Sequence, residues 1–223
     1  ASMKIAVLKE TRGGETRVAA SPESVKKFIG LGASFAIERG AGEVANFTDQ
    51  AFQDAGATIS PSAVDALDGA DLILKVRAPE AAEFRHYRAG QKLAAIVSPH
   101  SSADILAAAA HAGVELFAMD MMPRITRAQS MDVLSSQSNL AGYKAVIDAA
   151  AYYGRAMPMM MTAAGTIAPA KVFIMGAGVA GLQAIATARR MGAVVSATDV
   201  RWAAKEQVES LGATFVTVDQ EAM

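Results

Sequence analysis

The sequence predicts an α/β protein with two doubly wound parallel sheets, of which the second is truncated in this chain. In the first half, short apolar runs alternate with helical patterns. Near residue 171 a strand, a glycine-rich turn and a helix then begin a second unit. Strands that alternate with helices are typical of parallel sheets that are covered by helices on both faces.

The composition fits a folded chain of one or two domains. The chain has 223 residues, of which 52% are hydrophobic, and a formal net charge of −1. This charge balance gives no indication of a nucleic acid as partner. We find no secretory signal and no unbroken run of about 18 apolar residues, so we expect no membrane-spanning helix. Cysteine is absent, which excludes disulfides and thiolate catalysis.

The first region, residues 3–123, is expected to form a Rossmann-like domain in which strands and helices alternate. Ser21 is a typical N-cap with Pro22 at the first helical position, and Thr48 opens a second helix. Two strands are largely apolar throughout, as expected of strands that are buried on both faces. The expected strands are residues 4–10, 34–40, 71–76, 92–98 and 114–120, and the expected helices are residues 21–32, 48–56 and 102–113.

The second region, residues 124–163, is expected to be a polar loop, a linking helix and the start of an apolar arm. The run from Arg127 to Asn139 is mostly polar and contains neither glycine nor proline. Strong helix formers at residues 140–156 predict one long helix. The uncharged segment 157–170 indicates a hairpin or an extended arm, whose methionines, Met157 among them, could fill a core or form a contact surface.

The third region, residues 164–223, carries the most informative motif. A strand is followed by Gly176-x-Gly178-x-x-Gly181, a helix, and a second strand that ends at Asp199. Gly176 would allow a tight turn, Gly178 the close approach of a pyrophosphate, and Gly181 the close packing of the helix on the sheet. The pattern predicts the first half of a Rossmann-like NAD-binding domain. A tight turn in an α/β domain that binds nothing is the alternative.

Asp199 also bears on the choice of cofactor. Its carboxylate could accept hydrogen bonds from the ribose hydroxyls of adenosine, whereas a 2′-phosphate would place a second anion beside it. At ~4 Å this repulsion favours NAD over NADP by roughly one to three decades. Arg201 complicates the prediction, because a nearby arginine can accept that phosphate. We give the carboxylate at the strand tip more weight.

The expected second half of the dinucleotide fold does not follow. A third strand is expected at residues 213–219, close to the last residue of the sequence. The half that would hold the nicotinamide is then missing, so we expect either a fragment or a break at a flexible segment.

The sequence resembles the NAD(H)-binding domain I of proton-translocating nicotinamide nucleotide transhydrogenases, along its whole length from Met3. The most specific stretches are MPRITRAQSMDVLSSQSNLAGY, PMMMTAAGTIAPA and GVAGLQAIATARRMGAVVSATDVR. This family also includes alanine dehydrogenase, which shares the patterns ETRVAASPESV and LILKV.

The resemblance implies that the polar run reaches NAD(H). By motif, Arg124, Gln129, Asp132 and Ser135 would line the nicotinamide end. Arginine, glutamine and serine can donate hydrogen bonds, and Asp132 could accept from a ribose hydroxyl or hold Arg124 in place. A solvated loop between domains is the alternative. The other implied cofactor-binding residues are Gly176, Gly178, Val179, Ala180, Gly181, Asp199, Val200 and Arg201.

The implied reaction is hydride transfer from NADH to NADP⁺, coupled to proton translocation across a membrane. This step needs no general acid, base or metal, so we expect neither catalytic residues nor metal ligands in this chain. The chain would bind NAD(H), a separate partner domain would bind NADP(H), and a transmembrane domain would move protons. The resemblance also implies a cytoplasmic location, on the inner face of the bacterial inner membrane. The apolar arm favours a homodimer.

Two other functions remain open. An enzyme like alanine dehydrogenase needs a cation for a carboxylate and groups that transfer protons. Arg17 and Lys75 match the substrate residues of that relative, but Ser98 stands where its catalytic histidine is expected, and His100 follows two residues later. A non-enzymatic NAD-binding module is the third alternative, against which the specific polar run argues.

Overall fold

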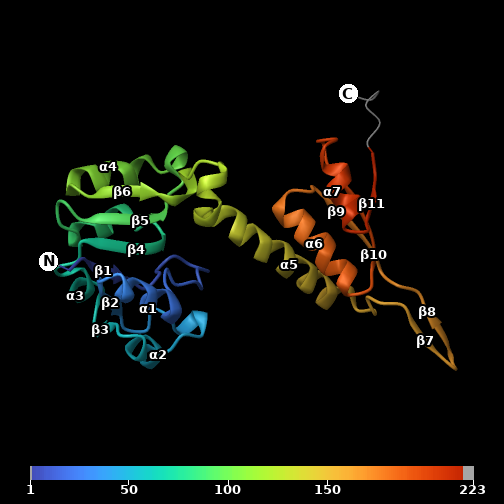
Figure 1. The fold of residues 1–223 in the computed structure, drawn as a ribbon, viewed down its shortest axis with the longest axis horizontal. Coiled ribbons are helices and arrows are strands. Elements are labelled where there is room, and N and C mark those ends of the chain that lie inside the picture. Colours follow the sequence, from blue (N-terminus) through green and yellow to red (C-terminus); the bar gives the residue numbers. More distant parts are fainter. Residues whose placement is uncertain (1, 218–223) are drawn as a thin grey trace. The chain divides into compact units, whose positions relative to one another are not determined.

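The computed structural model describes residues 2–217, which form two compact units (Figure 1). The first unit ends at Met131 and the second begins at Asp132. In residues 2–217, no helix combines the length and the apolar character that crossing a membrane requires.

The first unit contains a six-stranded sheet in which all neighbouring strands are parallel. Its order, β3-β2-β1-β4-β5-β6, is that of a doubly wound dinucleotide fold, so the predicted fold class is confirmed. The strand β3 was not expected from the sequence, because it spans only three residues. The strands are β1 (Lys4–Val7), β2 (Ser34–Glu38), β3 (Thr58–Ser60), β4 (Leu72–Arg77), β5 (Lys92–Ile96) and β6 (Glu115–Ala118).

Short helices connect these strands. As predicted, the side chains of Ser21 and Thr48 cap α1 and α2, accepting backbone N–H groups at 3.2 and 3.1 Å. The α-helices of this unit are α1 (Pro22–Gly30), α2 (Asp49–Asp54), α3 (Ala63–Leu67) and α4 (Ala103–Ala112). The 3-10 helices are η1 (Glu43–Ala45), η2 (Ala81–His86), η3 (Pro99–Ser101), η4 (Met119–Met121) and η5 (Thr126–Met131).

Alternate side chains along and just after β1 enter two separate apolar clusters. Ile5 and Val7 pack with buried residues of α1 and α2, whereas Ala6 and Leu8 pack with buried residues of α3 and α4. Successive side chains of a strand point to opposite faces of its sheet. Both faces of this sheet are therefore covered, which explains why its strands are apolar throughout.

The second unit contains a three-stranded parallel sheet with the order β11-β10-β9. Its β-α-β-α-β sequence matches the first half of a dinucleotide fold, which confirms the predicted class here too. Residues 218 and 219 of the predicted third strand lie outside the described residues. The elements are α5 (Val133–Tyr153), β7 (Met160–Thr162), β8 (Gly165–Ile167), β9 (Lys171–Met175), α6 (Val179–Arg190), β10 (Val194–Thr198), α7 (Ala204–Ser210) and β11 (Thr214–Phe215).

The helix α5 begins at Val133, well before its predicted start at Leu140. The Asp132 carboxylate caps it, accepting two backbone N–H groups of the first turn at 3.0 and 2.9 Å. The expectation of a loop throughout residues 127–139 is therefore wrong, because most of this run is helical. Its serines and amides are poor helix formers, and the local cap outweighs their weak propensity.

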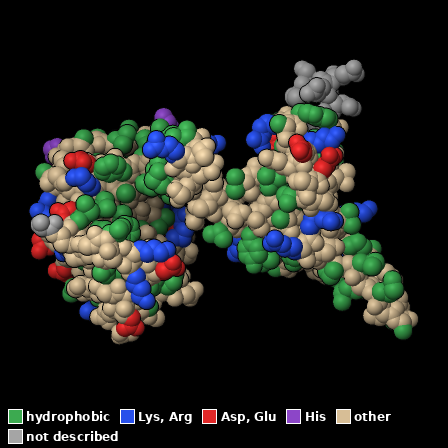
Figure 2. Space-filling model, viewed as in Figure 1, with side chains coloured by type: hydrophobic (Ala, Val, Ile, Leu, Met, Phe, Trp, Pro, Cys, Tyr) green, Lys and Arg blue, Asp and Glu red, His purple; other side chains and the backbone are tan. Residues whose placement is uncertain are grey.

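The segment 157–170 contains the predicted hairpin, in which β7 and β8 pair antiparallel. It extends away from the rest of the second unit (Figure 1), and hydrophobic side chains follow its length (Figure 2). Met159, Met160, Met161 and Ile167 are exposed there. Met157 does not share this surface as expected, because it is buried in the core of the unit.

Candidate functional site

The turn after β9 brings three glycines together at the carboxyl end of the second sheet. Gly176 has a φ of 94°, a left-handed conformation that glycine adopts without steric cost. A Cβ at Gly181 would lie 1.8 Å from the carbonyl oxygen of Gly176, so only glycine allows α6 to approach the turn this closely. At Gly178 a Cβ would meet nothing within 4 Å, which leaves open space beside the backbone.

The helix α6 starts directly beside this open space. Its N-cap is Gly178, which has no side chain to accept the N–H groups of the first turn. These N–H groups carry the positive end of the helix dipole, equivalent to about half an elementary charge. The N-terminus of α6 therefore offers donors to which phosphate oxygens could bind.

Asp199 connects the end of β10 to the glycine turn. Its Oδ2 accepts the N–H of Ala177, the residue between the first two glycines, at 2.7 Å. The Asp199 side chain is only 6% exposed. The two strand ends, β9 and β10, are thus joined through a carboxylate at the edge where dinucleotides bind in this fold class.

Arg201 provides the remaining donors to this carboxylate. Its backbone N–H and its Nε donate to Oδ1 of Asp199 at 2.8 and 3.0 Å, and its Nη2 donates to Oδ2 at 3.1 Å. These hydrogen bonds, the side-chain ones first, hold the pKa of Asp199 far below its usual range. The carboxylate is accordingly ionised at any physiological pH.

Together these groups fit the ADP part of a dinucleotide. Backbone donors and open space at Gly178 suit a pyrophosphate, and an ionised carboxylate at the next strand tip suits a ribose diol. The three elements that supply them, β9, α6 and β10, all belong to the second unit.

The helix α5 contacts the beginning of α6 at a glycine. A Cβ at Gly142 would lie 2.0 Å from the carbonyl oxygen of Ala180, in the first turn of α6. Hydrogen is therefore the largest side chain that this crossing accepts. The position of the phosphate-facing helix depends on α5 through this contact.

The implied nicotinamide-end residues are divided between the two units. Arg124 and Gln129 lie at and just before η5 in the first unit and are exposed, whereas Asp132 and Ser135 begin α5 in the second. Asp132 acts as the helix cap, and the Ser135 hydroxyl donates to its Oδ2 at 2.5 Å. Contacts of these four residues with a nicotinamide remain a prediction.

The remaining implied residues flank the glycine turn and Asp199. Val179 and Val200 have exposed side chains, whereas Ala180 is half-buried. Trp202, which we did not single out from the sequence, is exposed and packs edge-on against Phe215, with a centroid distance of 6.1 Å.

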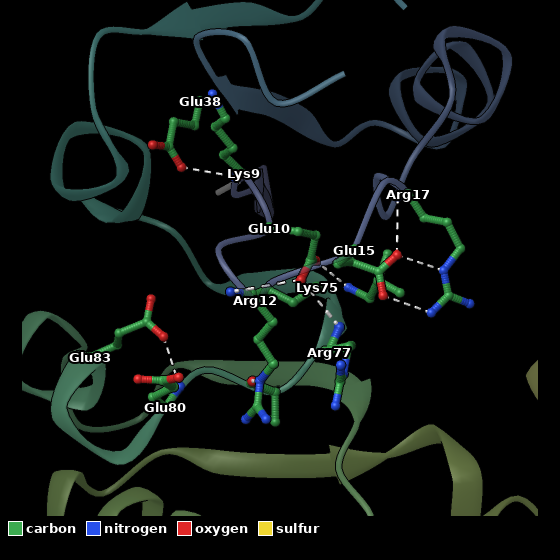
Figure 3. A network of polar contacts seen from close by, with 12 residues as sticks. Lys9, Glu10, Arg12, Glu15, Arg17, Glu38, Lys75, Arg77, Glu80 and Glu83 are labelled. Atoms are coloured by element: carbon green, nitrogen blue, oxygen red, sulfur yellow. Dashed lines mark hydrogen bonds and ion pairs between the residues drawn. The ribbon is translucent and has the colours of Figure 1, made fainter. Parts of the chain in front are cut away.

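The first unit carries a separate polar network after the ends of β1 and β4 (Figure 3). The Lys75 ammonium lies 3.9 Å from Oε2 of Glu10, and both side chains are only 2% exposed. Burial raises the pKa of Glu10. Arg17 forms two hydrogen bonds of 2.8 Å with the Glu15 carboxylate. The two cations considered for a substrate carboxylate thus each have a carboxylate of the chain as partner.

Ser98 and the histidines do not join this network through any contact seen in the described residues. Ser98 adopts a left-handed conformation with φ 54°, and its N–H donates to Asp120 at 2.8 Å. His86, His100 and His111 are exposed.

Sequence reasoning missed Gly142 and Ala177. Gly142 carried a usable signal, because a glycine inside a run of strong helix formers costs about 1 kcal/mol relative to alanine and so indicates close packing. Ala177 acts through its backbone N–H, for which its side chain gives no signal.

Comparisons with known proteins bear on both units. The N-terminal domain of the family described as alanine dehydrogenase/PNT matches residues 6–141, and its C-terminal domain matches residues 145–223. The first of the separate alpha-subunit chains of the NAD(P) transhydrogenase of Rhodospirillum rubrum is 56% identical over 99% of this chain. The chain spans 59% of the length of that relative.

Solved structures give the same picture. The transhydrogenase from Sinorhizobium meliloti is similar, with a TM-score of 0.93 and 60% identity, covering 96% of this chain and 64% of that chain. An L-alanine dehydrogenase is similar at a TM-score of 0.86 and 28% identity, covering 99% of this chain and 62% of that chain. The more distant sequence similarity to alanine dehydrogenase thus extends over both units.

Proposed function

The chain belongs to the alanine dehydrogenase/PNT family, and from this we propose that it is the NAD(H)-binding part of a transhydrogenase that moves hydride between NADH and NADP⁺. The observation that carries the proposal is the constellation at the end of the second sheet. The open backbone at Gly178, the N-terminus of α6 and the ionised Asp199 suit the pyrophosphate and adenosine ribose of NAD(H).

The bound nicotinamide supplies the hydride, and the protein supplies position. Hydride transfer depends on the distance and orientation of two nicotinamide rings and on the exclusion of water. Arg124, Gln129, Asp132 and Ser135 would act at that end, and Val179, Ala180, Val200 and Arg201 nearer to the phosphates and ribose. No proton has to be moved by these side chains during the hydride step.

The partners follow from this division of labour. A separate domain of the same complex would bind NADP(H), and a membrane domain would couple the redox step to proton movement. The chain would then lie on the cytoplasmic face of the bacterial inner membrane. The Rhodospirillum rubrum relative is named as one piece of an alpha subunit, which supports a complex built from several chains.

A homodimer would cover the exposed hairpin. Met159, Met160, Met161 and Ile167 form an uncharged surface on β7 and β8. Apolar surfaces of this kind usually mark a contact with another protein, and a two-fold axis would let each hairpin pack on the other subunit.

An amino-acid dehydrogenase is the second candidate, and the positions of Arg17 and Lys75 favour it. Against it, both cations are paired with carboxylates, and Ser98 takes the place of the expected histidine. The two candidates separate in one assay of the full-length protein.

That assay measures hydride transfer with and without an NADP(H)-loaded partner domain. We expect turnover only with the partner present, and neither oxidation of alanine nor reductive amination of pyruvate by the protein alone. Turnover of alanine would overturn the proposal. Binding of NADH without transfer to any NADP(H)-loaded partner would favour a non-enzymatic binding module.

A further inference from the structure

The carboxylate of Asp199 has no acceptor position left for a ribose. Each oxygen accepts two hydrogen bonds: Oδ1 from the backbone N–H and Nε of Arg201, and Oδ2 from the N–H of Ala177 and Nη2 of Arg201. An ionised carboxylate offers about four lone-pair positions. A ribose diol, which must donate both hydroxyls here, can bind only when a present donor leaves.

The guanidinium of Arg201 is the donor that can leave. The other two donors are backbone N–H groups whose positions are set by the glycine turn and by the strand end. The Arg201 side chain is 63% exposed, whereas that of Asp199 is 6% exposed. Exposed ion pairs contribute little to stability and exchange readily with water, so releasing the guanidinium does not require the fold to open.

We propose that Arg201 is a latch on the ribose-binding carboxylate and that it sets the discrimination between NADH and NADPH. This inference rests on the proposed function. The guanidinium presents two parallel N–H groups to the two carboxylate oxygens, as the vicinal 2′- and 3′-hydroxyls of a ribose would. Binding of NADH therefore exchanges one pair of donors for another.

The released guanidinium remains beside the site, because the backbone N–H of Arg201 stays bonded to Asp199. With NADH the guanidinium has lost its partner, so the latch opposes binding. With NADPH it can meet the 2′-phosphate and partly compensate the repulsion between that phosphate and Asp199. The same side chain thus weakens NADH binding and strengthens NADPH binding.

Removing the latch should move the two affinities in opposite directions. For Arg201→Leu we expect NADH to bind about two- to fivefold more tightly, the range that an exposed ion pair commonly represents. NADPH should bind at least about fivefold more weakly, because an unscreened carboxylate then faces its 2′-phosphate. For Arg201→Lys we expect NADH to bind more tightly as well, since a point charge cannot bridge both oxygens, while most NADPH affinity is retained.

The experiment is calorimetric titration of the full-length protein with NADH and with NADPH at two salt concentrations. Arg190→Leu is the matched control, because it removes an exposed arginine at the opposite end of α6, and it should shift both affinities by the same small factor. Opposite shifts in Arg201→Leu support the latch, whereas equal shifts or weaker NADH binding would overturn it. A wild-type protein that binds neither nucleotide would instead overturn the proposed function.

Discussion

Gly142 of α5 lies so close to Ala180 of α6 that a Cβ on the glycine would stand 2.0 Å from the alanine carbonyl oxygen. We therefore predict that Gly142→Ala destabilises the second unit. Overpacking of this kind costs about 1–3 kcal/mol, which exceeds the gain of about 1 kcal/mol in helix propensity. NADH binding should weaken too, because Ala180 belongs to the turn that faces the phosphates.

Urea denaturation followed by the fluorescence of Trp202, the only tryptophan of the sequence and part of the second unit, measures this loss. Asn139→Ala is the control, because it adds the same residue at an exposed position of the same helix. It should leave stability unchanged or raise it. An equally stable Gly142→Ala protein would show that the two helices can separate without cost.

Asp199 is predicted to set the nucleotide preference. The full-length protein should bind NADH at least about tenfold more tightly than NADPH, because a 2′-phosphate would lie beside an ionised carboxylate. Asp199→Asn should shrink this difference, whereas Asp148→Asn, an equal change of charge on exposed α5, should not. Equal wild-type affinities for NADH and NADPH would contradict the prediction.

Arg124 and Gln129 are predicted to position the nicotinamide rather than to hold the cofactor. Arg124→Ala and Gln129→Ala should lower the single-turnover rate of hydride transfer more than they weaken NADH binding. A misplacement of ~1 Å can cost about a hundredfold in rate, while most binding contacts lie at the glycine turn and Asp199. The exposed Arg127 in η5 provides the control variant Arg127→Ala. Wild-type rates in both test variants would reduce this stretch to a linker.

The hairpin is predicted to mediate self-association. Met160→Glu places a charge on the exposed face of β7, and desolvating that charge in an interface is unfavourable, so light scattering should detect dissociation. Leu31→Glu, a change at an exposed apolar position in the first unit, should leave the assembly intact. A monomeric wild type at micromolar concentration would refute the dimer.

Glu15 is predicted to make stability depend on acid pH. Hydrogen bonds from Arg17 lower the pKa of Glu15 from 4.5 to about 2. A depressed folded-state pKa adds stability that is complete above the ordinary pKa and disappears as the pH falls through the folded value. Wild type should therefore exceed Glu15→Gln in denaturation midpoint at pH 7, and the difference should vanish near pH 2. Glu23→Gln, which alters an exposed pair, should show little difference at either pH.

Much of the fold could be predicted because its signals are local. The caps at Ser21 and Thr48, the apolar strands and the spacing of Gly176, Gly178 and Gly181 each act within a few residues. The start of α5 was misplaced because Asp132 caps a helix whose first turns are polar, so periodicity gave no warning. The β3 strand was too short to show a pattern.

The site was less predictable because its geometry comes from groups that periodicity does not register. The N–H of Ala177 and the shared donors on Asp199 appear only when β9 and β10 lie side by side. Gly142 matters only because α5 crosses α6 at that residue. Met157 reads like its neighbours in sequence but is buried at the base of the hairpin, where its carbonyl oxygen accepts the N–H of Ala170 at 2.9 Å.

The methionines of the hairpin also make its surface open to chemistry. Thioethers are readily oxidised to sulfoxides, which are polar and which reductases convert back. Met161 is 71% exposed and Met157 is 8% exposed, so an oxidant would reach the hairpin long before the core. Oxidative damage would therefore strike first at whatever contact the hairpin makes, while leaving the fold that carries the dinucleotide turn in place.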